Sequence, residues 1–295
     1  MEVLVVGNTA YVDDGFCAKA FPGDHVKVVA AQEARRDESS PHASWKELLQ
    51  HLEQAYEFDR VVYLSNYLTP HTDTVGDIEL LRSVFRTCAG RRIQLLYIAG
   101  PAGAEGAADA AGRTGKGIIA HAANDLCRYY AAREGVQTKI LRVPFLYTAS
   151  AALEDPFLVP LFDACSTGSA ALQGAQDAAF PLLCAEELSV LVRRIFDSWN
   201  GNFETLDVVD TFHHTVGEVG EALQALFPGL SVAYGDSAGY ALPASDVARV
   251  RYGWFQRYDL LRDLSTIQAR WDAGRAKKVN PLRAAIDRIQ MRTLP

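Results

Sequence analysis

The sequence predicts an α/β fold in which the first half forms a doubly wound parallel sheet. Apolar runs of strand length recur along this half, at residues 3–6, 26–30, 60–65, 93–98 and 139–143. Longer segments with helical periodicity separate these runs, and several of them end at a glycine, as helices commonly do. Such alternation is typical of βαβ units, which build a parallel sheet with helices on both faces.

The segments between the strands favour helices. Ser44 and Glu47 have the spacing of a capping box, which predicts that a helix starts at Ser44. Residues 100–117 are rich in small residues, and we expect a loop there. The helices expected in the first half cover residues 14–20, 44–55, 77–88 and 118–134.

The alternation ends near Thr148, which indicates a second, smaller unit. Beyond this point the pattern predicts helices over 185–199 and 214–226 and a strand over 206–209. We therefore expect a small C-terminal α+β lobe beside a Rossmann-type domain. The Rossmann-type domain is expected to comprise residues 1–147 with 178–199 returning to it, and the lobe 148–177 and 200–272.

The last residues, 273–295, are expected to form a C-terminal helix or a linker. Asn280 is a suitable N-cap and Pro281 a suitable first helical residue, and Leu282, Ile286 and Ile289 follow at helical spacing. Three interpretations stay open for this segment: a free tail, a docking helix, and a linker into a downstream domain.

Composition excludes several classes of protein. The chain has 295 residues with 49% hydrophobic composition, enough to bury a full core, and its formal net charge of −7 argues against a nucleic-acid partner. No apolar run approaches the roughly 18 residues that span a bilayer, and the N-terminus enters a strand pattern without signal-peptide anatomy. The five cysteines are scattered, which favours a cytoplasmic setting and predicts no metal site.

Several segments in order resemble one enzyme family. They are RVVYLS (60–65), LLYIAG (95–100), the run from GIIAHAAND to LRVPFLYTA (117–149), FPLLCAEELSVLV (180–192) and DVARVRYGWFQRYDLLRDLSTIQARW (246–271). Together with the first strand and its glycine turn they resemble the extended short-chain dehydrogenase/reductase family, the NAD-dependent epimerases and dehydratases, over residues 1–271. The resemblance implies NAD(P) at the carboxyl ends of the strands and a lobe that closes over substrate. It also implies a homodimer formed by the helices 77–88 and 118–134.

The resemblance assigns the phosphate turn to the residues after the first strand. The family's Gly-x-x-Gly-x-x-Gly pattern corresponds here to Gly7, Ala10 and Asp13, so a methyl and a carboxylate replace two glycines. The carboxylate of Asp13 would repel a phosphate, unless it serves as a helix cap. The cofactor contacts expected at this turn are Gly7, Asn8, Ala10, Tyr11 and Val12.

The second cofactor determinant is also altered. The ribose-binding acid of the family corresponds to Ala31. Arg35 and Arg36 could meet the 2′-phosphate of NADP, or could be surface charges. The resemblance thus implies NAD(P) as the cofactor, whereas the residues found at these positions do not by themselves indicate a cofactor.

The catalytic positions differ more. Relatives use a Ser or Thr, a Tyr, and a Lys four residues later, which lowers the pKa of the phenol during hydride transfer. Here Gly117 lies at the Tyr position, His121 at the Lys position, and Pro101 within the hydroxyl position. Glycine donates no proton, and a neutral imidazole cannot replace an ammonium group near neutral pH.

The remaining polar residues near the strand ends are candidate ligand contacts. They are Ser65, Asn66, His121, Arg142 and Tyr147. Our leading hypothesis is a catalytically inactive module used for ligand sensing or protein interaction, within a larger protein if a domain follows, with an unknown, nucleotide-like small molecule as partner. The alternative is an active NAD(P)-dependent nucleotide-sugar epimerase, dehydratase or reductase with a relocated acid/base, and a third hypothesis is a subunit that only dimerises.

Overall fold

The computed structural model describes most of the chain. It covers residues 1–7, 9–12, 14–30, 58–65, 75–100, 115–149, 155–172, 174–236 and 247–290, without the side chains of 9, 14, 30, 75, 76, 115–119 and 276–290. The expected helix 44–55, the ribose position Ala31 and the candidate contacts Asn8, Asn66 and Pro101 lie outside these residues, as does Asp13.

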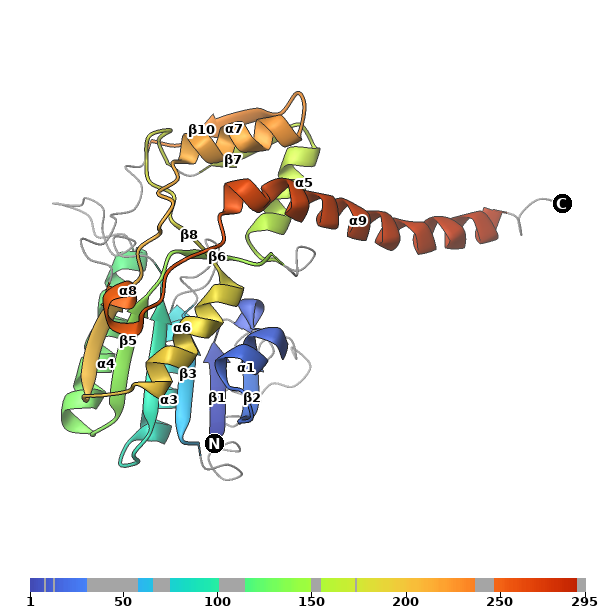
Figure 1. Cartoon of the computed structure of the whole chain (residues 1–295). Helices are drawn as coiled ribbons and strands as arrows, with labels where there is room; N and C mark the ends of the chain where they lie inside the picture. Colours follow the sequence, from blue (N-terminus) through green and yellow to red (C-terminus); the bar gives the residue numbers. More distant parts are fainter. Residues whose placement is uncertain are drawn as a thin grey trace.

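The described residues form a parallel sheet of six strands in the order β2-β1-β3-β4-β5-β9 (Figure 1). The chain starts in the interior at β1, runs outward to β2, and then returns to β3 on the other side of β1. This reversal of direction creates a topological switch point between β1 and β3, where ligands of doubly wound folds bind. The strands are β1 (Glu2–Gly7), β2 (His25–Ala30), β3 (Arg60–Leu64), β4 (Gln94–Ala99), β5 (Gln137–Arg142) and β9 (Phe203–Asp207).

Helices cover both faces of this sheet. On one face the core contains Phe16 of α1, Leu188 of α6 and Tyr252 of α8, and on the other it contains Phe85 of α3 and Cys127 of α4. The strands between them are buried along nearly their whole length, which explains their continuous apolar runs. The helices are α1 (Asp14–Ala20), α3 (Val75–Cys88), α4 (Gly115–Arg133), α6 (Ala185–Asp197) and α8 (Val247–Tyr252), and a 3-10 turn η1 (Thr9–Tyr11) precedes α1.

The lobe lies at the carboxyl edge of the sheet and has a core of its own (Figure 1). Aromatic residues dominate this core: Phe162 of α5 contacts the rings of Phe227 and Trp271. The lobe elements are β6 (Phe145–Tyr147), α5 (Leu158–Ser166), β7 (Ser169–Leu172), β8 (Leu182–Cys184), α7 (Val216–Leu226), β10 (Ser231–Tyr234) and the first half of α9 (Leu260–Gln290). Thr215 and Glu218 form a capping box that starts α7.

Sequence patterning predicted the first half of the fold well and the second half less well. The sheet strands and the helices at 14–20, 77–88 and 185–199 occur within a few residues of their expected positions, although α4 starts at Gly115. The strand expected at 206–209 is β9 (Phe203–Asp207), and it pairs with β5 in the main sheet instead of joining the lobe. The short lobe strands are three or four residues long, too short to show a period.

The C-terminal helix differs from its expectation. Instead of starting at Asn280, α9 is one continuous helix from Leu260 to Gln290, and Pro281 lies inside it. A proline within a helix removes one backbone hydrogen bond but does not always end the helix. No helix in the described part of the chain is both long enough and apolar enough to cross a membrane.

Gly7 is the residue on which the switch point depends. Its φ is +109°, and a Cβ atom there would lie 2.2 Å from the carbonyl oxygen of Leu64. Backbone and strand pairing leave no room for this atom to move, because Gly7 and Leu64 face each other in the β1–β3 register.

We expect Gly7→Ala to lower the free energy of unfolding by at least about 3 kcal/mol, because strain and steric overlap add. Gly23→Ala is the matched control, since Gly23 also has a positive φ of 80° but nothing lies within 4 Å of its added Cβ. Its expected cost is about 1 kcal/mol. Urea unfolding of both variants measures the difference, and equal costs would refute the steric role of Gly7.

Candidate ligand site at the carboxyl edge of the sheet

The turn after β1 forms the floor of the candidate site. Gly7 ends the strand, η1 follows directly, and its Tyr11 is buried in the core between the sheet and α6. The hydroxyl of Tyr11 forms no hydrogen bond within the described residues, and burial raises its pKa. Ala10 is exposed, whereas Val12 is half-buried. Burial is described for four of the five predicted cofactor contacts, and of these four Ala10 is the exposed one.

Ser65, at the end of β3, is engaged within the protein. It is completely buried, and its hydroxyl donates to the carboxylate of Asp77 at 3.1 Å. Tyr63 donates to the same carboxylate at 2.6 Å, and burial beside this acid raises the pKa of Tyr63 well above its usual range. Asp77 belongs to the first turn of α3, so these bonds fix the start of that helix to β3.

Arg142, at the end of β5, is likewise engaged. Its guanidinium forms two hydrogen bonds to the carboxylate of Asp207, Nε to Oδ1 at 2.6 Å and Nη2 to Oδ2 at 2.8 Å. The two residues face each other in the β5–β9 register, and about a quarter of each side chain is exposed. A bidentate pair of this kind orients both partners strongly.

Tyr147 points away from the open edge and into the lobe. The side chain is fully buried among the residues of the lobe core, on the strand β6 that pairs with β8. Its hydroxyl has no hydrogen-bond partner in the described part of the structure, and burial near the thiol of Cys184 raises its pKa. A phenol held in its neutral form at this depth contributes packing instead of proton transfer.

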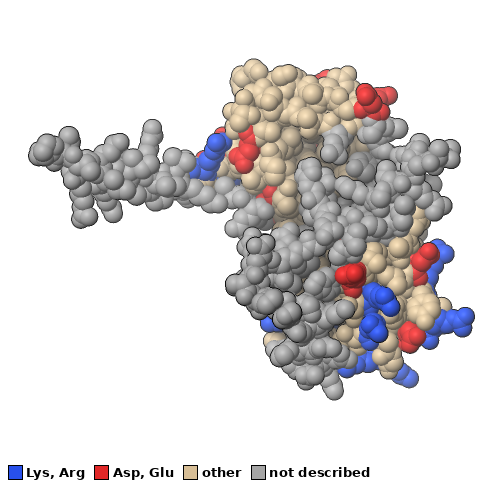
Figure 2. Space-filling view, turned by 180° about the vertical axis from the view of Figure 1, so that it is seen from behind, with Lys and Arg blue, Asp and Glu red and all other residues tan. Residues whose placement is uncertain are grey.

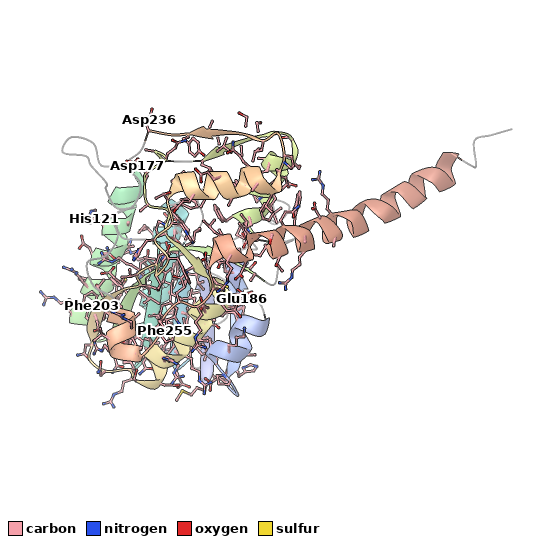
Figure 3. The ribbon with its side chains drawn as sticks, turned by 45° about the horizontal axis from the view of Figure 1, so that its top comes forward. His121, Asp177, Glu186, Phe203, Asp236 and Phe255 are labelled. Carbon is pink, nitrogen blue, oxygen red and sulfur yellow. The ribbon has the colours of Figure 1, made fainter. Side chains whose placement is uncertain are left out.

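The first two turns of α4 carry the positions that the resemblance assigns to catalysis. Gly117 lies in the first turn of the helix, and His121 follows one turn later. His121 is exposed and lies at the end of α4 that is nearer the lobe (Figure 3). Farther along the helix Tyr130 stacks on Phe85 in the core, whereas Tyr129 is exposed.

Asp155 joins the lobe to the strand below it, a role that the sequence analysis missed. Its carboxylate is buried and accepts hydrogen bonds from the backbone N–H groups of Thr148, Phe157 and Leu158 and from the hydroxyl of Thr148. Burial nevertheless raises the pKa of this carboxyl, because desolvation outweighs these bonds. An Asp-Pro pair directly before an apolar helical run was the available signal.

Glu187 holds the segment that leads from α8 into α9. Its carboxylate accepts from the backbone N–H groups of Arg257 at 2.7 Å and Tyr258 at 3.1 Å, and its backbone carbonyl accepts from the indole of Trp254 at 3.2 Å. Gln256 adds bonds to the backbone of Thr211, Leu182 and Tyr258. Glu187 is thus a structural clamp that positions the segment between α8 and α9.

Two further polar residues are paired within the protein. His214 lies 2.7 Å from Asp259, at the junction of the lobe and α9, while its neighbour His213 is exposed with a φ of +56°. Arg251 pairs with Glu204 on β9. Among the described residues, no cluster of His, Cys, Asp and Glu could hold a metal ion.

The described residues fit a dinucleotide in part. Gly7 has the conformation and the close packing that a phosphate turn needs, and exposed Ala10 leaves the turn open to solvent. Gly117 and His121 do not fit the proton transfer that accompanies hydride transfer, because neither offers a phenol or an ammonium group.

No protein-family model matches the sequence, and no curated protein matches it either. Solved structures do match. A dTDP-glucose 4,6-dehydratase from Streptomyces venezuelae with NAD bound aligns with a TM-score of 0.69 and 11% identity, over 92% of this chain and 96% of that one. A UDP-glucose 4-epimerase from Thermotoga maritima with UDP-glucose gives a TM-score of 0.68 and 13% identity, over 94% and 100%.

A third similar structure has a different activity. The GalE-like L-threonine dehydrogenase from Cupriavidus necator aligns with a TM-score of 0.60 and 17% identity, over 91% of this chain and 98% of that one. The chain therefore has the fold of the extended short-chain dehydrogenase/reductase family, and the predicted fold class and resemblance are confirmed.

We expect Arg142→Gln to destabilise the protein by about 2 kcal/mol, because it leaves the partly buried carboxylate of Asp207 without its charged donor. The double variant with Asp207→Asn should recover at least about 1 kcal/mol of this loss. Chemical denaturation of the four proteins of the cycle measures the coupling. Strict additivity would contradict a direct interaction.

Glu187→Gln should destabilise the protein by roughly 1–3 kcal/mol, because one of the two bound N–H groups then faces an amide NH₂. The matched control is Glu221→Gln on the exposed side of α7, where a change within about 0.5 kcal/mol is expected. Thermal unfolding distinguishes the two, and a Glu187 variant as stable as the control would show that the clamp is dispensable.

Proposed function

We propose that this chain, which has the fold of the extended short-chain dehydrogenase/reductase family, binds a nucleotide-type ligand at the carboxyl edge of its sheet without transferring hydride. The observation that carries the proposal is the content of the first two turns of α4. Gly117 and exposed His121 stand there, where the family resemblance requires a phenol and a lysine. A module of this kind would act by sensing its ligand.

The binding half of the proposal is supported by the turn after β1. Gly7 keeps the left-handed backbone and the tight approach to Leu64. Such a turn places backbone N–H groups toward the edge, where they can donate to phosphate oxygens. The exposed Ala10 borders this turn, so a ligand could approach it from solvent.

The non-catalytic half is supported by the partners of the polar residues at the edge. Ser65 donates to Asp77, Arg142 is paired with Asp207, and Tyr147 is buried in the lobe. These groups contribute to the stability of the fold, and a reaction that needed them free would first have to break these contacts. Recruiting one of them as an acid or base would therefore cost folding free energy.

An active NAD(P)-dependent nucleotide-sugar epimerase, dehydratase or reductase is the second candidate. The fold of solved dehydratases and epimerases, together with the retained Gly7 turn, favours it. It requires a relocated acid/base, and exposed His121 on α4 is the residue placed for that role.

Ligand titrations with NADH, NADPH, UDP-glucose and dTDP-glucose test the binding half. We expect at least one of them to bind, and Ala10→Glu to weaken this ligand tenfold or more, since like charges about 5 Å apart repel by roughly 3 kcal/mol at an effective dielectric near 20. Ala18→Glu, on the exposed side of α1, adds the same charge away from the turn and should leave affinity unchanged. Failure of all four probes to bind would overturn this half.

Conversion of UDP-glucose and dTDP-glucose in the presence of NAD+ or NADPH, followed by chromatography of the sugar nucleotides, tests the chemical half. Product analysis is needed because epimerases and dehydratases return the hydride to the substrate and leave the absorbance at 340 nm unchanged. We expect no conversion, for the wild-type chain and for His121→Ala alike. Turnover by the wild type that falls at least a hundredfold in His121→Ala, as removal of a general base typically produces, would establish the second candidate instead.

A further inference from the structure

The second half of α9 extends away from the described part of the molecule (Figure 1). The first half is docked: Leu260, Leu264, Ile267 and Trp271 are buried in the lobe core. Beyond Arg275 the helix continues to Gln290 and projects away from the rest of the chain (Figure 1). These fifteen residues (276–290, hereafter the extension) span about 22 Å at the rise of an α-helix.

The sequence of the extension is amphipathic and basic. Val279, Leu282, Ile286 and Ile289 recur at spacings of three and four residues, which places them on one face of the helix. The extension contains four basic residues and one acidic residue: Lys277, Lys278, Arg283 and Arg288 against Asp287. Burial against a partner surface stabilises an apolar face of this kind, because it removes aliphatic area from water.

Two segments of the lobe have the opposite charge. Residues 155–184 and 208–246 contain eight Asp and Glu residues and no Lys or Arg, whereas the first half of α9, which completes the lobe, carries Arg262, Arg270 and Arg275 beside Asp263 and Asp272. Figure 3 shows two of these acids, Asp177 and Asp236, at the end of the lobe far from the sheet. On the face shown in Figure 2 the lobe carries red groups, while blue groups gather lower, over the Rossmann-type domain, and beside α9. The exposed acids of the described lobe are Asp163, Asp177, Glu218, Glu221 and Asp236.

One contact inside the chain already joins these two surfaces. Arg275, the last described side chain of α9, lies 3.9 Å from the carboxylate of Asp163 on α5 and donates to Ser166 at 3.1 Å. Its guanidinium also packs over the ring of Trp271. The half-buried Phe227 contacts the same Trp271. The basic helix and the acidic lobe segments therefore meet beside Trp271 and Phe227, at the point where the extension begins.

We propose that the extension docks on the acidic lobe of a second copy of this chain. Two copies that exchange extensions form a closed twofold dimer, in which each lobe receives the helix of the other copy. Lys278 and Arg283, which flank the apolar face of the helix, then face the exposed acids of the lobe, and the apolar face is covered. Charge complementarity of this kind orients the partners and fixes the register of the contact.

Other occupants fit the charges less well. Two extensions paired with each other would bring four basic residues against four, which is unfavourable. An anionic membrane would attract the extension but repel a body whose residues 1–246 contain 32 acidic and 18 basic residues. The family-type dimer through α3 and α4 would use a different surface, which exposes Arg82, Arg86 and Asp125 in the described residues.

Sedimentation velocity of the full chain, over roughly 1–100 µM, tests the proposal. We expect a dimer that weakens at least tenfold between about 0.05 and 0.5 M salt, where screening shortens the reach of the charges. Lys278→Glu with Arg283→Glu should weaken the dimer tenfold or more, and so should Glu221→Lys with Asp236→Lys on the lobe. Combining all four changes should restore dimerisation, because the charges are then complementary again.

Arg82→Glu with Arg86→Glu on α3 is the matched control and should leave the dimer intact. The proposal is wrong if the wild type stays monomeric over this range, or if the dimer responds to the α3 variant and not to the charge reversals. Flotation with phosphatidylserine vesicles provides a second readout. Binding to these vesicles through Lys278 and Arg283, by a chain that stays monomeric, would assign the extension to a membrane surface and overturn the dimer.

Discussion

The close approach of two backbones at the centre of the sheet is the constraint on which the site depends. Gly7 and Leu64 are paired across β1 and β3, and the carbonyl oxygen of Leu64 occupies the space that any side chain at position 7 would need. This contact sets the direction in which the chain leaves β1 and so positions η1 and α1. It also lies at the point where the strand order reverses, which makes it the floor of the candidate site.

Around this turn, the described polar residues at the strand ends form hydrogen bonds within the protein. Asp77 holds the start of α3 against β3, and Asp155 anchors α5 to the loop after β6. Asp207 on β9 pairs with Arg142 on the neighbouring strand β5. Each buried carboxylate is satisfied by several donors, as buried charges must be. These hydrogen bonds fix the starts of α3 and α5 and the pairing of β5 with β9.

Positive and negative charges are also separated between parts of the chain. The sheet and its helices carry both signs, the two lobe segments carry acids and no Lys or Arg, and the extension of α9 is basic. Glu187 and Gln256 fix the segment that leads into α9, so the direction of this helix is determined by buried hydrogen bonds. The basic extension and the acidic lobe segments are the two surfaces that the proposed dimer brings together.

The sequence by itself determined the parallel sheet, because buried strands must be apolar along their length and helices must alternate with them. It also determined that positions 117 and 121 hold a glycine and a histidine, since that is a matter of residue identity. Only the tertiary structure decided that Ser65, Arg142 and Tyr147 have partners or burial inside the protein, because those depend on strand register and lobe packing across long separations. The same holds for β9, whose place beside β5 follows from hydrogen bonds between residues about 65 positions apart, which no local pattern records.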